Sequence, residues 1–596
     1  MPVSPQLDSE GPVRVTILSN GAAVADSVQL ISVRVQRSAN TIPSARLLVE
    51  DGDMAASDWP VANAATFVPG AAITIKAGYG DEEETIFEGI VVKLGMKIAT
   101  ANVSRLVVDC QDKAVAMTVG RKNANYVQQT DDAVIRKLAG AHGLSIEVDA
   151  TNTTYQELVQ YYCTDWDYLL ARAEANGLLV IATDGKLSVK APQVSGAAVL
   201  KVTYGADLIE FQAEMDSRTQ FASVEAVAWD PKTQDIVRGS AATPPTLNAQ
   251  GNITSATLAQ VLGLATLTIQ TATPLEAASL TEWAKARQVK AGLARIRGRM
   301  RFQGSAKAAV GELIELEGVG ERFNGKVFVG GLEHEIADGN WTTEAEFGLS
   351  PDWFTERTDI VAPPAAGWLP GAEGLQVGVV MKLDGDPLGE QRIQVKVPVL
   401  DAETPGVWAR LAQFYASSAF GAFFLPEVGD EVILGYFNND PSHPVILGSL
   451  YSSKNQPAYA IEAENNVKAL VTRCLAKIEI REDDKSITIT TPANNKIVLS
   501  DKDKTILVQD ETLNKVTLSP SGISLESPKD ITISAKGSMQ LDAVGPVSIA
   551  SKADVTMTGM NVTCEGQVAF TGKGAASAEL SAAGQTTVKG AMVMIN

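Results

Sequence analysis

The most regular pattern of apolar and polar positions lies in the last hundred or so residues of the chain. There, two apolar residues flank one small or polar residue, and the group recurs at a step of eight residues that shrinks to seven at the last repeat. Alternation with a period of two is typical of a strand with one buried face, so each repeat predicts a short strand followed by a turn. The apolar pairs are Ile523/Leu525, Ile531/Ile533, Met539/Leu541, Val547/Ile549, Val555/Met557 and Val562/Cys564.

An eight-residue repeat is too short to enclose a core within one chain. A single-chain β-helix needs roughly 18 or more residues per coil, so eight residues supply about one side of a closed cross-section. Three chains wound around one axis would bury the alternate apolar side chains, each of which forfeits roughly 1.5–3 kcal/mol when exposed. We therefore predict a homotrimeric, intertwined β-helical needle over 486–596, with the first five pairs in its interior. A sandwich of two sheets with short antiparallel strands is the alternative.

The chain before this repeat predicts two β-barrels with a helical insertion. Alternating segments separated by Gly, Asn, Asp and Pro predict one barrel at about 1–120 and a second at about 200–355. Two short helices are predicted within 130–180, because Thr130-Asp131-Asp132 and Thr164-Asp165-Trp166-Asp167 are typical N-terminal caps followed by apolar residues at helical spacing. Together these elements form a predicted domain over 1–360.

Three further features complete the predicted organisation. Thr273-Pro274-Leu275-Glu276 predicts a capping box that opens another helix. Residues 361–374 are rich in Pro, Gly and Ala and predict a linker. Five strand-like segments in 375–455 favour an OB-type barrel at this length, followed by a connector at 456–485. The predicted fold class is therefore mainly β.

Composition limits the possible functions. The formal net charge of −20 argues against a nucleic-acid partner, because binding to phosphates needs a concentrated basic face. No stretch approaches the ~18 consecutive apolar residues of a membrane span, and the first residues lack the basic and apolar regions of a signal peptide. The four cysteines are far apart, which predicts free thiols in a protein made in the cytoplasm.

Candidate catalytic and metal-binding residues are sparse. Glu427, Asp430 and Glu431 resemble the paired carboxylates of a glycosidase, but acids beside a Gly turn are more often solvated. The Ser and Thr residues of the repeat have no nearby His partner, and the only histidines have no metal-ligand spacing. We therefore predict no enzyme activity, no cofactor and no metal site. The histidines are His142, His334 and His443.

Several motifs resemble one family of spike proteins. The sequence LPEVGDEVILGYFNNDPSHPVILGSLY at 425–451 is similar to the OB-domain signature of VgrG and phage baseplate spike proteins, and VWARL at 407–411 fits that signature. The sequence DWDYLLARAEANG at 165–177 resembles the hub domain of the same family, and FNGKV at 323–327, with Val329 and His334, resembles the end of that domain. The order of hub, OB barrel and needle covers nearly the whole chain.

The resemblance implies a structural central spike of a contractile injection machine, as in phage tails, type VI secretion systems and extracellular injection systems. It implies a trimeric hub that docks on an Hcp-like tube and on baseplate proteins, and a needle that pierces the target envelope mechanically. After assembly in the cytoplasm, contraction would deliver the spike, with any effector cargo, to the extracellular space or the target cell. Some relatives carry a lysozyme domain before the needle, but the roughly 35 residues after Tyr451 are too few for a domain.

The end of the sequence predicts a contact with a tip protein. Some phage spikes bind a metal at their own apex through an HxH motif, which this sequence lacks, so the resemblance implies a separate PAAR-type tip protein. Val593, Met594, Ile595 and Asn596 of three chains are expected to form its platform through strand edges and apolar side chains. The alternative function is a trimeric β-helical tailspike or adhesin with glycan-binding or hydrolase activity.

Overall fold

The computed structural model describes residues 2–8, 11–99, 103–360, 365, 370–398 and 405–595. The chain divides into two compact units, Met1–Leu450 and Tyr451–Asn596. Strands outnumber helices in the described residues of both units, which confirms the predicted mainly β fold class. Among the described residues, no helix has both the length and the apolar character needed to cross a lipid bilayer.

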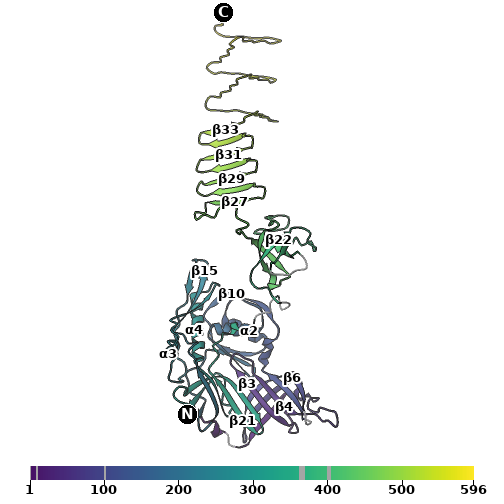
Figure 1. The fold of residues 1–596 in the computed structure, drawn as a ribbon, viewed down its shortest axis with the longest axis vertical. Helices are drawn as coiled ribbons and strands as arrows, with labels where there is room; N and C mark the ends of the chain where they lie inside the picture. The colour runs from purple at the N-terminus through teal and green to yellow at the C-terminus, as the bar shows by residue number, and fades with distance from the viewer. Residues whose placement is uncertain are drawn as a thin grey trace. The chain divides into compact units, whose positions relative to one another are not determined.

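A sheet of 13 strands forms the base of the first unit. It joins strands from both predicted barrels, because β20 pairs antiparallel with β3, from Gly331 opposite Ser38 to Ala337 opposite Ser32. Figure 1 shows β3, β4, β6 and β21 in this region. The strands are β1 (Val13–Ser19), β2 (Ala22–Ala23), β3 (Leu30–Ser38), β4 (Ser44–Glu50), β5 (Ala72–Tyr79), β6 (Glu82–Ala99), β7 (Val103–Gln111), β13 (Leu200–Thr203), β14 (Leu208–Met215), β18 (Ile296–Gln303), β19 (Leu313–Glu317), β20 (Gly325–Ala337) and β21 (Asn340–Phe347).

Each half of this sheet has its own apolar core. Alternating side chains point to one side of each strand, so the two halves bury separate sets of branched and aromatic residues. The first core includes Val33, Leu47, Ile75, Phe87 and Val108, and the second includes Leu200, Phe302, Ile314, Val327 and Phe347.

A helical subdomain lies in the sequence between the two groups of strands that form the 13-stranded sheet. It contains the two helices predicted within 130–180. Helix α1 (Asp131–Ala141) and helix α2 (Asp165–Ala175) each begin after a threonine, and the hydroxyl of Thr164 accepts a hydrogen bond from the Asp167 N–H at 3.0 Å. Both helices bury the apolar face predicted from their spacing. The accompanying strands are β8 (Lys122–Thr130), β9 (Ser145–Val148), β10 (Thr154–Cys163), β11 (Leu179–Thr183) and β12 (Lys186–Lys190).

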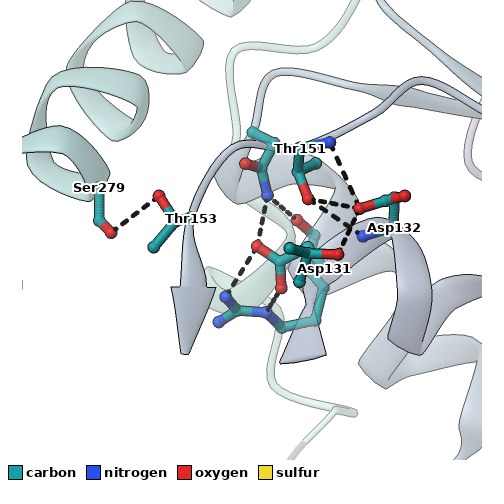
Figure 2. Close-up of polar contacts among 8 residues, drawn as sticks. Asp131, Asp132, Thr151, Thr153 and Ser279 are labelled. Carbon is teal, nitrogen blue, oxygen red and sulfur yellow. Dashed lines mark hydrogen bonds and ion pairs between the residues drawn. The ribbon is translucent and has the colours of Figure 1, made fainter. Parts of the chain in front are cut away.

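A buried polar cluster joins the two helices. The Asp131 carboxylate accepts hydrogen bonds from Arg172 Nε at 2.5 Å and Nη2 at 3.0 Å, and from Asn176 Nδ2 at 2.7 Å. Figure 2 shows Asp131 within this cluster, next to the pair formed by Asp132 and Thr151. Because each carboxylate oxygen of Asp131 has a partner, this buried charge is satisfied.

Helix α4 (Ala277–Leu293) packs on a small three-stranded sheet. The helix has Glu276 as its N-cap and no side-chain capping bond, so the capping box predicted at Thr273 is wrong. The Thr273 N–H instead donates to the Thr271 hydroxyl, and the helix begins later. The other elements are α3 (Ser255–Ala259), β15 (Val224–Asp230), β16 (Asp235–Arg238) and β17 (Leu267–Thr271).

The first unit also contains a closed five-stranded barrel in the order β22-β23-β24-β26-β25, which confirms the predicted OB-type domain. Alternate residues of its strands fill the interior, including Val380, Val395, Ala409, Val432 and Ile446. In the predicted linker, 361–364 and 366–369 lie outside the described residues. The strands are β22 (Gln376–Lys382), β23 (Ile393–Lys396), β24 (Val407–Leu411), β25 (Glu431–Tyr436) and β26 (Pro444–Ser449).

The second unit opens with a seven-stranded antiparallel sheet in which each strand pairs with the next along the chain. Figure 1 shows these strands stacked in sequence order. The sheet begins inside the segment 456–485 that was predicted to be a connector. Its strands are β27 (Val467–Val471), β28 (Lys477–Arg481), β29 (Ser486–Thr490), β30 (Lys496–Ser500), β31 (Thr505–Gln509), β32 (Lys515–Ser519) and β33 (Gly522–Glu526).

Candidate functional site: the C-terminal sheet and the octad segment

One face of the C-terminal sheet is apolar except at Lys468 in its first strand. The strand register aligns the second and fourth residue of each strand with those of its neighbours, as in the pairs Ile478 opposite Ile489 and Ile497 opposite Val508. We call the resulting set the apolar ladder. It consists of Leu470, Ile478, Ile480, Ile487, Ile489, Ile497, Leu499, Ile506, Val508, Val516, Leu518, Ile523 and Leu525.

The apolar ladder is uncovered in a single chain. Apart from the half-buried Val516, its side chains are 38% to 77% exposed. All apolar clusters that are buried among the described residues lie in the first unit, and no apolar side chain of 451–595 is buried. Full burial of a branched side chain contributes roughly 1.5–3 kcal/mol, so the ladder provides a strong driving force for association.

The opposite face of the sheet is mostly polar. The alternate positions are occupied largely by Lys, Glu, Arg, Ser and Thr, as expected for a face in contact with water. Hydrogen bonds from Lys477 and Tyr459, together with one from Arg481, lower the pKa of the Glu479 carboxyl to about 2. The sheet is therefore two-sided, with only one face suited to a dry contact.

The turns of this sheet follow a repeat of 19 residues. Up to β32, loops of five residues, such as 472–476 and 491–495, alternate with loops of four residues, such as 482–485, and the last loop has two residues. Most of these loops contain one residue with positive φ, such as Leu475 or Asn494. The alternation places successive apolar pairs nine and ten residues apart, and this spacing is the sequence signal that could have located the ladder upstream of Ile523.

After β33 the chain continues as an extended segment with regular bends, which we call the octad segment (527–595). Bends occur at 528/529, 536/537, 544/545, 552/553, 560/561, 567/568, 575/576, 583/584 and 591. The step is eight residues with a single step of seven after 560/561, so it matches the apolar repeat of the sequence. The bends also extend the repeat beyond Cys564. Figure 1 shows the segment as a zigzag that ends at the C-terminus.

Within 527–595, all of which the structure describes, the chain forms no strand and no backbone–backbone hydrogen bond. The strands predicted from Ile531 onward are therefore not formed by a single chain. A strand needs a hydrogen-bonded neighbour, and successive octads do not pair with each other. The trimeric β-helix remains a prediction.

The predicted interior residues lie in two different settings. Ile523 and Leu525 belong to the apolar ladder, opposite Leu518 and Val516 of β32. The remaining residues lie in the octad segment and are 50% to 77% exposed in the single chain. They are Ile531, Ile533, Met539, Leu541, Val547, Ile549, Val555 and Met557. Of the predicted tip platform, Val593, Met594 and Ile595 are exposed, whereas Asn596 lies outside the described residues.

The structure does not bring the candidate chemical residues together. The Asp430 carboxylate accepts a hydrogen bond from the Glu427 N–H at 2.9 Å, which closes the turn before β25, where Glu431 is the first residue. His142 contacts Asp165, His334 contacts Thr343, and His443 contacts Asp440. No group of three potential metal ligands occurs among the described residues.

A family model described as the Alg8 N-terminal domain matches residues 9–338, which is more than half of the chain. The chain belongs to the Alg8 N-terminal domain family. A second model, the type VI secretion system/phage-baseplate injector OB domain, matches residues 376–451 of this family member and covers the closed barrel.

Curated proteins similar to this family member include spike proteins. It is 31% identical over 137 residues to the type VI secretion system spike protein VgrG3 of Vibrio cholerae, which covers 22% of this chain and 13% of the relative. It is 34% identical over 148 residues to the actin cross-linking toxin VgrG1 of Vibrio cholerae, which covers 24% of this chain and 13% of that protein. The chain thus spans only a small part of the length of these relatives. The predicted resemblance to VgrG-type and phage baseplate proteins is confirmed by these relatives and by the OB-domain match.

Among solved structures, the 43 kDa tail protein of prophage MuSo2 from Shewanella oneidensis aligns with 57% of this chain and 98% of its own length. The sequence identity is 12% and the TM-score is 0.43.

Proposed function

We propose that this protein is the structural central spike of a contractile injection machine, built as a homotrimer whose needle pierces a target envelope. The observation that supports this proposal most directly is the apolar ladder, which is exposed in a single chain and continues into the octad segment. The proposal is also supported by the match to an injector OB domain and by relatives that are named spike proteins.

Three copies would bury the apolar ladder that a single chain leaves uncovered. Each copy contributes one sheet with an apolar and a polar face, so three sheets around an axis form a prism with a dry interior and a wet exterior. The octad segment supplies one side per level in the same way. Its unpaired backbone would obtain hydrogen bonds from the neighbouring copies, which a single chain does not provide.

The partners and the location follow from this role. The hub would dock on an Hcp-like tube and on baseplate proteins, and an effector would travel as cargo. The spike would be made and assembled in the cytoplasm and delivered on contraction to the extracellular space or the target cell. The machine would be a phage tail, a type VI secretion system or an extracellular injection particle.

The role is mechanical rather than enzymatic. The name of the VgrG1 relative states a toxin activity. We do not propose this activity for the present chain, because the match covers only 13% of that relative. A trimeric tailspike or adhesin is the alternative, and cleavage of surface glycans by the purified trimer would favour it over the spike.

The oligomeric state of the full chain tests the proposal. The mass measured by light scattering should be three times 62.9 kDa. The Ile489→Asp/Ile497→Asp variant places two charges on the apolar ladder and should yield single chains. The matched Thr488→Asp/Thr490→Asp variant changes the polar face and should stay trimeric. A wild-type protein with the mass of one chain would contradict the proposal.

The tip platform is tested separately. Removal of residues 589–596 should leave the trimer intact, because the ladder and most octads remain. It should abolish the capture of a PAAR-type tip protein in a pull-down. Retained capture would reject the role of Val593 to Asn596.

A further inference from the structure

The OB barrel carries an exposed aromatic hairpin in the loop between β24 and β25. Two of its rings are the most exposed of the set, Phe414 at 88% and Phe423 at 83%. Its 12 residues, 413–424, include five aromatic side chains that are more than half exposed. The five are Phe414, Tyr415, Phe420, Phe423 and Phe424.

The hairpin is held in a defined conformation by its backbone. The Ala422 N–H donates to the Tyr415 carbonyl at 2.8 Å, and the Ser417 N–H donates to the Phe420 carbonyl at 3.0 Å. The Gln413 side chain also donates to the Phe424 carbonyl at 2.6 Å. The aromatic rings are therefore presented to solvent by an ordered hairpin.

The amount of exposed apolar surface is larger than a monomer usually shows. With about 200 Å² for each ring, the five side chains expose roughly 700 Å². The largest apolar patch of a typical soluble monomer is about 300–600 Å², and one partner of a standard interface buries about 800 Å². The hairpin therefore has the size of an interface.

We infer that the aromatic hairpin packs against the OB barrel of a neighbouring copy of the same chain, as a second trimer contact in addition to the needle. This inference rests on the proposed function, because it requires three copies around one axis. It assigns the hairpin to self-association rather than to a tube protein or a cargo.

Charge supports a second copy as the occupant. One residue in five of this chain is charged, and the formal net charge is −20, so two copies carry a net electrostatic repulsion. Residues 411–426 contain no charged residue. Two copies can meet there without placing carboxylates against each other.

The barrel also carries a second apolar area that could receive the hairpin. A ring of identical copies joined head to tail needs two different patches on each copy. Leu375, Val377 and Leu447 are exposed on β22, β26 and the segment before β22, whereas the hairpin follows β24. These two surfaces on separate elements provide the two different patches that a head-to-tail contact between copies requires.

The connection to the needle means that a weak contact between barrels is sufficient. The 17 residues between Ser449 and Val467 connect the barrel to the C-terminal sheet. Once the needle has assembled, this connection keeps the three barrels close together and so raises their effective concentration for one another.

Photo-cross-linking of the full-length protein tests the inference. Phe423→p-benzoylphenylalanine should give products with the mass of two and three chains on a denaturing gel after illumination. Leu388→p-benzoylphenylalanine is the matched control, because Leu388 is 70% exposed on the same barrel but lies outside the hairpin. It should give single chains.

Two results would overturn the inference while the proposed function stands. One is a three-copy mass by light scattering together with only single-chain products from the Phe423 probe, and the other is equal multi-chain products from both probes. A one-copy mass would instead reject the proposed function. As a second variant, Phe414→Ser/Phe424→Ser in the probe protein should keep the three-copy mass and lower the cross-linking yield several-fold, and an unchanged yield would count against the hairpin.

Discussion

Single buried polar residues in the hub depend on one or two partners. Asp131 is fully buried and relies on Arg172 and Asn176, whereas His334 is buried between strands and shares a hydrogen bond with Thr343 at 2.9 Å. Such groups add specificity when they are paired and become costly when a partner is removed.

The Arg172→Met variant should destabilise the helical subdomain by about 3–5 kcal/mol, because it leaves the Asp131 carboxylate buried with one partner fewer. The first transition in thermal or urea unfolding reports this change. The Arg172→Met/Asp131→Leu variant removes the charge as well and should recover much of the loss. If both variants are equally unstable, the buried charge is not the cause.

Burial, together with the nearby Arg37 guanidinium, lowers the pKa of His334 to about 3, compared with 6.5 in an unfolded chain. Below pH 6.5 the unfolded state therefore takes up a proton that the folded state does not, and stability should fall as the pH is lowered from 6.5 toward 3. Unfolding midpoints of the wild type and of His334→Gln across this range test the effect. An equally steep decline in the variant would show that other groups are responsible.

Among the helices and strands, the elements differ in how many of their contacts come from residues that are nearby in sequence. The helices α1 and α2 carry their caps and apolar faces within about a dozen residues, and the barrel strands alternate clearly, so their sequences predict them. In the C-terminal sheet, apolar pairs are local but the partner surface is not. Within one chain, the strands of this sheet are therefore paired by hydrogen bonds, but their apolar face is left uncovered.

Cys564 provides a test of the octad register. It occupies the second apolar position of its octad and is exposed in the single chain, as is Cys474 in the first five-residue loop of the C-terminal sheet. In an assembled needle a maleimide should modify Cys474 and leave Cys564 unmodified until denaturation. A hydrogen bond with Thr472 lowers the pKa of Cys474, which favours its labelling. Rapid native labelling of Cys564 would contradict its interior position.

Two features could not be predicted from the sequence, for different physical reasons. The pairing of β20 with β3 joins residues nearly 300 positions apart, and no local pattern encodes which strand meets which. The apolar ladder before Ile523 does have a signal, but loops of four and five residues alternate, so its spacing is irregular. The octads could be predicted because their step is almost constant, whereas the partners proposed for them are other copies, which a single chain does not contain.

At the scale of the whole molecule, the two units are stabilised in different ways. The first unit buries several apolar cores of its own, whereas the described part of the second buries none. If the protein is the proposed homotrimer, the second unit would gain its stability from association, so its folding would depend on protein concentration.

This difference predicts strong kinetic stability of the trimer, because separating one chain requires breaking contacts with two others. Unheated samples should migrate as trimers on a gel containing dodecyl sulfate, and boiled samples as single chains. The Ile489→Asp/Ile497→Asp variant should migrate as single chains in both conditions. Rapid dissociation of the wild type on dilution would argue against an interlocked needle.

The change from hairpin-connected strands to octads at Glu526 sets a direction for assembly. Hairpins close within one chain in microseconds, so three sheets can form and meet before any octad is ordered. The octads would then zip up from the sheet toward the C-terminus, each level offering a template for the next. Damage near the C-terminus would shorten the zipper, whereas damage to the sheet would remove its starting point.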